Sequence, residues 1–271
     1  MDLRELGTDV DWPDSEASTA VRERLAGQTA LGRLASLAEW AIGVRPPGSS
    51  FHNVRALVVG AEPPPLVIDT AAAVDAQVVG VPAEGGTQAG VAIADDAIER
   101  GTELLIVAVP GLGADAAITV SVLAGAEPVK VLERGAAATD PEAWMRLAVE
   151  VRDGRRRCLP HNNDPDALLA ELGSQRLAVA AGAVLRAAGR RTPVLLDGPV
   201  ATAAALLAYE AQPRAVRWWT AVDRGAEPLS GLVLDRLSQA PVLGLGTSTG
   251  DGLAGLLAVP VLRAATALAS G

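Results

Sequence analysis

The turn between Gly111 and Gly113 has the residue types that bind a phosphate group. It directly follows the strand-like apolar run of residues 103–109 and precedes an apolar run typical of a helix. Glycines at such a turn let backbone N–H groups approach an anion, and the N-terminus of the helix adds partial positive charge. Ordinary turn formation explains the same glycines, and Asp115 fits a helix cap whose charge would repel a phosphate. We keep both interpretations open.

Two aspartates stand beside glycines at the ends of apolar segments. Asp197 ends the strand-like run of residues 193–197 and could bind ribose hydroxyls or cap the helix that follows. Asp251 lies between Gly250 and Gly252, just before the last apolar stretch, where capping of a helix is the local explanation. Ligands of an open parallel sheet bind outside the carboxyl ends of its strands. That rule selects both aspartates and the glycine turn described above as the candidate site.

Arginines are the main candidates to bind an anionic group. Lys130 is the only lysine, and residues 128–132 have the pattern of a short buried strand, so we discard a Schiff-base lysine and a Walker-type phosphate lysine. Arg134 and Arg146 follow this segment, and one of them could clamp a phosphate. The three consecutive arginines at 155–157 are typical of a solvated helix end.

The elements that must position these residues alternate between strand and helix. Strand patterns cover residues 54–60, 77–81 and 103–109, and a helical pattern covers residues 86–100. This spacing predicts a βαβ unit with a right-handed crossover, and therefore a parallel sheet. Further elements are predicted at 193–197, 215–221 and 242–245 for strands, and at 141–153, 165–189 and 201–212 for helices.

The two chain ends are predicted to pack together as a separate helical unit. Residues 15–43 have helical spacing, and the proline- and glycine-rich segment 46–50 ends this unit. We therefore predict an α/β protein with a parallel, Rossmann-like sheet flanked by helices, and a small helical domain formed from both ends. The predicted boundaries are 1–48, 52–224 and 225–271.

Composition narrows the classes of protein to consider. Hydrophobic residues make up 49% but aromatic residues only 3%, which favours close helix–sheet layers. The net charge of −9 argues against nucleic-acid and anionic-membrane partners. Cys158 is the only cysteine, so an intrachain disulfide is impossible, and with two histidines a structural zinc site is not expected. We expect a cytoplasmic protein without a metal, a bound cofactor, a membrane span or a signal peptide.

Several motifs occur in the same order as in a known enzyme family. Residues 181–206 are similar to that family's helix, strand and DGF-ATAAAL stretch, and residues 223–228 to its HRS-x-EP element. The turn 250–252 followed by residues 258–265 is similar to its LGEG and ALAxPxLRAA motifs, and residues 30–34 to its SLGRLE helix. The chain thus resembles the nicotinate-nucleotide:dimethylbenzimidazole phosphoribosyltransferases of cobamide synthesis.

The resemblance implies a transfer of phosphoribose from nicotinate mononucleotide to dimethylbenzimidazole or a related base. One base nitrogen attacks C1′ of the ribose as nicotinate leaves, and a carboxylate takes the proton of the other nitrogen. By position, that general base falls on Asp251 and the phosphate-binding cation on Arg146. The other substrate-binding positions that we assign are Gly111, Gly113, Arg134, Gly135, Asp197, Gly250 and Gly252.

Other parts of the chain depart from the family pattern. Residues 108–116 lack the acid and hydroxyls of its GEMGIGNTT loop, residues 60–64 replace its GDHGV turn, and residues 173–176 replace its GGFE turn. The helix of its base pocket, NF-GGAAIN, is predicted to have no counterpart, because only a short segment follows Glu62 before the next strand. Asp251 is also one methylene shorter than the family's glutamate, about 1.5 Å less reach.

These departures leave three alternatives for function. The chain is an active phosphoribosyltransferase, a non-catalytic paralogue that acts as a binding or regulatory subunit, or another nucleotide-binding Rossmann-like enzyme. Because the family is usually homodimeric and residues 25–42 offer an apolar face, we expect a homodimer that binds small molecules and neither nucleic acid nor membrane.

Overall fold

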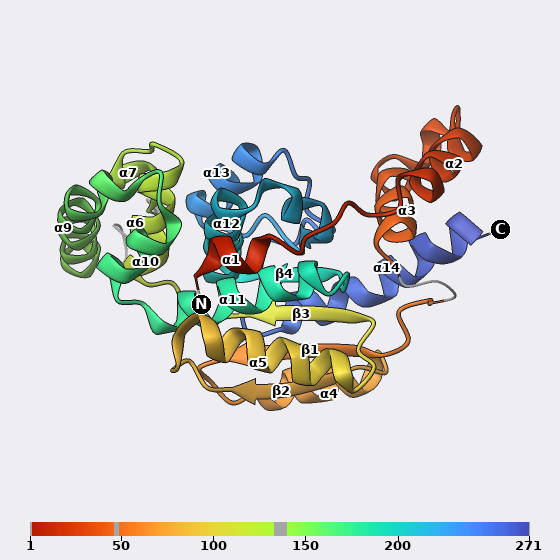
Figure 1. Cartoon of the computed structure of the whole chain (residues 1–271), viewed down its shortest axis with the longest axis horizontal. Helices are drawn as coiled ribbons and strands as arrows, with labels where there is room; N and C mark the ends of the chain where they lie inside the picture. The colour runs from red at the N-terminus through yellow and green to blue at the C-terminus, as the bar shows by residue number, and fades with distance from the viewer. Residues whose placement is uncertain (1, 46–48, 133–139, 271) are drawn as a thin grey trace.

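The computed structural model describes residues 2–45, 49–132 and 140–270, and its centre is a five-stranded parallel sheet (Figure 1). The strand order is β2-β1-β3-β4-β5. The chain runs from β1 outwards to β2 and then crosses back to β3, so the topological switch point lies between β1 and β3. The strands are β1 (Val54–Val59), β2 (Gln77–Val81), β3 (Leu104–Ala108), β4 (Val194–Asp197) and β5 (Trp219–Ala221).

Helices cover both faces of this sheet. On one face, α5 (Gly86–Glu99), α11 (Gln175–Gly189) and α12 (Gly198–Ala211) pack side by side against β1, β3 and β4. On the other face, α4 (Pro65–Ala73) and the long α14 (Leu253–Ser270) pack against each other and against the strands. The central strand β3 is fully buried between these layers, which explains its continuous apolar sequence.

A group of four helices lies beyond the carboxyl ends of the strands, at the left of Figure 1. It consists of α6 (Ala114–Leu123), α7 (Pro128–Val131), α9 (Pro141–Cys158) and α10 (Pro165–Leu172), with η2 (Leu159–His161) between the last two. The short α1 (Leu3–Gly7) packs on α11, while α13 (Pro228–Leu237) packs on α12 and follows η3 (Pro213–Trp218) and β5. The core is built largely from alanine, valine and leucine.

The helices that follow α1 lie beside the C-terminal helix at the right of Figure 1, whereas the N-terminus itself lies by the main body. There α3 (Arg33–Val44) packs on α14 and on α2 (Ser15–Leu25), and η1 (Thr29–Leu31) lies between α2 and α3 along the chain. Their buried cluster contains Leu25 and Ile42 from this N-terminal pair and Ala265 and Ala269 from α14. The apolar face of residues 25–42 is therefore covered in part within the chain, while Leu31, Leu34 and Leu37 stay partly exposed, and its role toward a second subunit stays a prediction. The proposed domain boundaries themselves stay a prediction.

The predicted α/β class and the parallel sheet are confirmed, but several local predictions are wrong. Residues 128–131 form the helical turn α7 instead of a strand, and residues 213–218 form a 3-10 helix before β5. Residues 242–245 do not form the predicted strand, although Val242 N and Leu243 N donate to Ala221 O and Val222 O at 3.0 and 2.7 Å. The predicted helices 15–43 and 165–189 are each interrupted by a turn.

The segment between the first two strands also differs from prediction. We expected no helix there, yet α4 occupies it and begins with Pro65 at its first turn. Proline is well tolerated at that position because its missing N–H has no partner in a helix start. The run of three prolines at 63–65 therefore leads into a helix.

Candidate active site

The turn of residues 250–252 lies across the carboxyl ends of three neighbouring strands. A Cβ placed on Gly250 would be 2.5 Å from the carbonyl oxygen of Val109, directly after β3, and 3.5 Å from that of Asp197 in β4. Gly250 has a φ of +62°, so both its conformation and this close approach require glycine. A Cβ on Gly252 would lie 3.7 Å from Val58 of β1. The turn therefore covers the topological switch point, where ligands of such sheets bind.

Asp251 is held at the tip of this turn by two local hydrogen bonds. Its Oδ1 accepts from Thr249 Oγ1 at 2.8 Å and from the backbone N of Leu253 at 3.1 Å. The second bond satisfies an N–H group at the start of α14, as predicted for a local cap. Since Asp251 is only partly buried, its other carboxylate oxygen can still accept a proton from a ligand at the carboxyl edge. Capping and catalysis are thus compatible at this residue.

Asp197 is the buried carboxylate beneath the turn. It is only 2% exposed, and its Oδ2 accepts from the backbone N of Gly255, in the first turn of α14, at 2.8 Å. Burial raises the pKa of Asp197 to about 6, and the negative charges of Asp251 and Asp223 act in the same direction. The residue therefore ties the end of β4 to the start of α14. Its assignment to ribose hydroxyls is untested and stays a prediction.

The loop after β3 is closed by an ion pair that was not predicted. Arg176 Nε and Nη2 donate to the two oxygens of Asp115 at 2.8 and 2.6 Å, and Ser174 Oγ donates to Asp115 Oδ2 at 2.6 Å. Arg176 Nη1 also donates to the carbonyl oxygen of Pro110 at 3.2 Å. A Cβ on Gly113 would lie 2.1 Å from Arg176 Nη2, so this glycine makes room for the guanidinium.

This ion pair changes the interpretation of Asp115. Burial alone would raise the pKa of its carboxyl group, but the hydrogen bonds from Arg176 and Ser174 prevail and lower it. The oxygen Oδ1 also accepts from the backbone N of Ala116 at 2.9 Å, near the start of α6. Asp115 is therefore ionised and neutralised by Arg176. The sequence contained both residues, but nothing in their spacing predicted the pair.

A third aspartate organises the segment that leads to the turn. Asp223 Oδ2 accepts from Leu245 N, Thr247 N and Thr247 Oγ1 at 3.0, 3.1 and 2.9 Å. Burial opposes ionisation of Asp223, but the hydrogen bonds from Thr247 outweigh it and lower its pKa. Ser248 Oγ accepts from Ala226 N at 2.7 Å. These contacts fix the path of the chain before Gly250.

The predicted phosphate-binding arginine Arg146 is not joined to this cluster by any described interaction, whereas the glycine loop is. Arg146 lies on α9 with a side chain that is 71% exposed, and its Nη1 is 3.7 Å from Glu142 Oε2 on the same helix. Arg134 and Gly135 lie outside the described residues. Gly111 has a φ of +75°, and its N donates to Thr249 O at 3.3 Å, so it joins the loop after β3 to the turn beside Asp251.

No metal centre is found among the described residues. One of their helices has the length and composition of a membrane span. Among residues 2–45, 49–132 and 140–270, no group of three His, Cys, Asp or Glu side chains could hold a metal ion. Within the same ranges α14 alone is long and apolar enough to cross a membrane, but half of it is buried inside the protein. Its burial against the sheet is typical of a core helix.

Comparison with known proteins places the chain among enzymes of one type. A family model described as phosphoribosyltransferase matches residues 12–271. A nicotinate-nucleotide–dimethylbenzimidazole phosphoribosyltransferase of Streptomyces avermitilis is 34% identical over 86% of this chain and 72% of its own length. The enzyme of the same name from Mycobacterium tuberculosis is 43% identical over 67% of this chain, which spans about half of that relative's length, 51%.

The solved structures give the same result for the fold. A crystal structure of CobT from Thermus thermophilus superposes with a TM-score of 0.79 and 25% sequence identity. The match covers 94% of this chain and 96% of the other. The similarity therefore extends over most of the chain and is not limited to the sheet.

Proposed function

Because the chain belongs to the phosphoribosyltransferase family whose model matches residues 12–271, we propose that it transfers phosphoribose from nicotinate mononucleotide to dimethylbenzimidazole or a related base. The observation that carries this proposal is the position of Asp251. Its partly exposed carboxylate lies over the switch point of the sheet, beside the loop that contains Gly111. A ligand held there has a general base within the same cluster.

In this proposal, Asp251 accepts the proton of the base nitrogen that does not attack C1′. The attacking nitrogen forms the new C–N bond as the bond from C1′ to the nicotinate nitrogen breaks, and nicotinate leaves. Removal of the proton keeps the product base neutral, so the carboxylate stabilises positive charge that develops in the transition state. Its hydrogen bonds to Thr249 and Leu253 fix the carboxylate without consuming both oxygens.

The remaining assigned residues act on the position and charge of the mononucleotide. Gly250 and Gly252 shape the turn, and Gly111 and Gly113 shape the loop on which the phosphate is proposed to bind. Arg146, together with Arg134 and Gly135 of the segment outside the described residues, stays the proposed phosphate contact. Asp197 is proposed to act chiefly by holding the start of α14, because its carboxylate is buried and bonded to Gly255.

The test compares Asp251→Asn with the wild type in nicotinate release and in formation of the base nucleotide, both measured by chromatography. We expect kcat to fall about a hundredfold or more, because the lost proton transfer matters mainly in the transition state. The affinity for nicotinate mononucleotide, measured by calorimetry, should stay within about twofold, since that ligand has no proton for Asp251 to accept.

Asp153→Asn is the matched control, because Asp153 is an exposed aspartate of α9 paired with Arg152. It should keep full turnover. Full turnover of Asp251→Asn would contradict the general-base role. A wild type that releases no nicotinate with dimethylbenzimidazole, benzimidazole or purine bases would contradict the proposed reaction itself and favour a non-catalytic binding role.

We also propose that the protein works in the cytoplasm as a homodimer. The exposed leucines Leu66 of α4 and Leu257 of α14 lie on helices that pack together, with 62% and 39% of each residue exposed. Exposed apolar side chains on two packed helices favour association. Light scattering is expected to give twice the chain mass of 27.6 kDa, and a value of 27.6 kDa at every concentration would contradict the dimer.

A further inference from the structure

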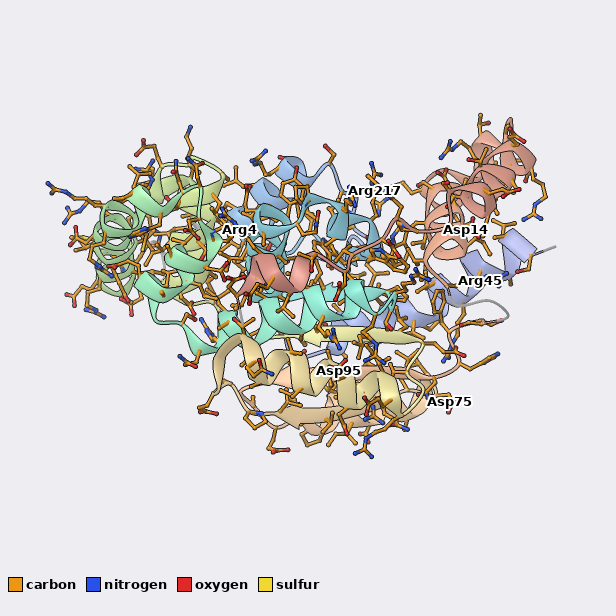
Figure 2. All side chains as sticks on the ribbon, in the orientation of Figure 1. Arg4, Asp14, Arg45, Asp75, Asp95 and Arg217 are labelled. Atoms are coloured by element: carbon orange, nitrogen blue, oxygen red, sulfur yellow. The ribbon has the colours of Figure 1, made fainter. Side chains whose placement is uncertain are left out.

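A large cleft lies at the end of the sheet opposite the candidate active site. Its volume is about 1030 Å³, and it is bounded by α3, η3, the end of α13 and the segment 240–244. Helices α12 and α13 both start at the carboxyl edge and run back, so Tyr209, Arg217 and Arg236 lie at the amino edge of the strands. Figure 2 shows Arg217 on the side of the body that faces α3. Nothing in the proposed reaction uses this cleft.

The charge of the cleft is opposite to that of the protein. Four arginines line it among the described residues, namely Arg33, Arg214, Arg217 and Arg236, and no aspartate or glutamate of the described chain is among its lining residues. The whole chain, in contrast, carries a net charge of −9. Four positive charges without a lining carboxylate repel one another and attract anions.

Three of these arginines have no acidic partner within the described residues. Arg236 pairs with Glu210 at 3.0 Å, whereas Arg33, Arg214 and Arg217 form no ion pair with any described carboxylate. Elsewhere in the described chain, arginines commonly pair with carboxylates, as Arg176 does with Asp115. Unpaired guanidinium groups retain their N–H donors for a ligand, and their planar fork matches the oxygens of a phosphate.

Aromatic rings stand next to the guanidinium groups. The Arg214 guanidinium lies 6.0 Å from the centre of the Trp12 ring, and that of Arg236 lies 5.8 Å from the centre of the Tyr209 ring. Such contacts orient an arginine without using its N–H groups. Trp40 of α3 donates from Nε1 to Arg217 O at 3.0 Å and so joins the two walls of the cleft. Exposed and partly exposed rings offer stacking surfaces for a planar group.

We propose that this cleft binds a nucleoside diphosphate, with the phosphates on Arg33, Arg214 and Arg217 and the base against the rings of Trp12 and Trp40. The three unpaired cations match the charge of a diphosphate, and the volume is at the upper limit of ordinary small-molecule sites, about 300–1,000 Å³. The site is separate from the one that carries Asp251, so it would bind its ligand in addition to the substrates.

Intrinsic fluorescence provides a direct test, because Trp12, Trp40 and Trp219 line the cleft. ADP, pyrophosphate and adenosine are each titrated into the wild-type protein. We expect a saturable change with ADP, a weaker affinity for pyrophosphate, which lacks the base, and the weakest for adenosine, which lacks the phosphates. Higher salt should weaken ADP binding because the contacts are ionic. Trp40→Phe should give a smaller fluorescence change on addition of ADP. A smaller change would show that the signal arises in the cleft.

The double variant Arg33→Gln/Arg217→Gln tests the assigned residues. It should weaken ADP binding about tenfold or more, since it removes two charge-assisted contacts. The matched control Arg24→Gln/Arg156→Gln removes the same charge from exposed arginines that do not line the cleft and have no described ion pair, and it should bind like the wild type. Nicotinate release by the cleft variant should be unchanged.

No response to ADP, or equal affinity in the two double variants, would overturn the proposal. A lower mass of the cleft variant in light scattering would also overturn it, since a second copy of the chain would then occupy the cleft.

Discussion

Charged side chains at the two ends of the sheet differ in whether they have partners within the chain. At the carboxyl edge, Asp115, Asp197 and Asp223 each find donors within the chain, so their charges hold loops and helix starts in place. In the cleft at the amino edge, arginines Arg33 and Arg217 have no carboxylate partner among the described residues. A charged group with internal partners positions its surroundings, whereas one without them is free to recognise a ligand.

The ion pair between Asp115 and Arg176 should give the largest effect on stability. The two side chains are only 18% and 27% exposed, so removal of one leaves the other charge largely desolvated. We expect Arg176→Leu to lower the free energy of unfolding by about 3 kcal/mol, measured by urea denaturation. Arg33→Leu, in the cleft, should change it by less than about 0.5 kcal/mol, because the side chain is exposed and without an acidic partner.

The same measurement can contradict the difference proposed between the two ends of the sheet. If Arg33→Leu destabilises as much as Arg176→Leu, the cleft arginine has a structural role and the distinction between the two ends is wrong. The double variant Asp115→Ala/Arg176→Leu should lose less stability than the sum of the single changes, because it removes both charges together.

Asp197 should give the next largest effect, as a dependence of stability on pH. Its pKa in the folded protein is about 6, above the ordinary value of 3.8, so the native state retains a proton that the unfolded chain releases. Its contribution is therefore fully present below pH 3.8 and is lost as pH rises through 6, by about 3 kcal/mol in total.

Asp197→Asn removes this titration and keeps an acceptor for Gly255 N. The free energy of unfolding of the wild type minus that of the variant should fall between pH 4 and pH 7. The lowered pKa values of Asp115 and Asp223 act with the opposite sign, but they are present in both proteins and cancel in the difference. A difference that does not change with pH would show that the carboxyl group of Asp197 titrates normally.

Gly250→Ala tests the close packing of the turn. The added Cβ would meet the carbonyl oxygen of Val109 at 2.5 Å, and the φ of +62° is unfavourable for alanine. We expect a loss of about 2 kcal/mol in thermal or urea unfolding. Gly246→Ala is the control, because it has a similar φ of +73° with no atom within 4 Å of the added Cβ. Equal losses of stability in the two variants would show that the backbone conformation alone, and not the contact with Val109, causes the effect.

The sequence predicted those features that depend on local pattern or on strand topology. The apolar runs identified β1, β3 and β4, and the rule for parallel sheets placed Asp251, Asp197 and the loop of Gly111 at one edge. Residues 128–131 were assigned wrongly because a short apolar run fits a helix turn as well as a strand.

Other features could not be predicted because they depend on contacts between distant residues. Asp115 and Arg176 are separated by 61 positions, and only the tertiary fold brings the first turn of α6 to the start of α11. The cleft draws on α3, η3 and α13, whose arginines appear individually as ordinary surface residues in the sequence. Spacing along the chain contains no signal for such clusters.

Among the aspartates of the carboxyl edge, the smallest expected effect on stability belongs to Asp251, the residue proposed to matter most for the reaction. Its carboxylate accepts from Thr249 Oγ1 and Leu253 N, and the amide oxygen of asparagine can accept the same two bonds. Asparagine also caps helix starts about as well as aspartate, so Asp251→Asn should change the free energy of unfolding by less than about 0.5 kcal/mol. Urea denaturation of the wild type and the variant checks this value. A loss of 2 kcal/mol or more, above the roughly 0.5–2 kcal/mol range for a lost cap, would mean that Asp251 is a structural anchor like the other aspartates of this edge. A neutral change in stability combined with a large loss of kcat would distinguish Asp251 from those aspartates. Its carboxylate would then serve the reaction and not the stability of the fold.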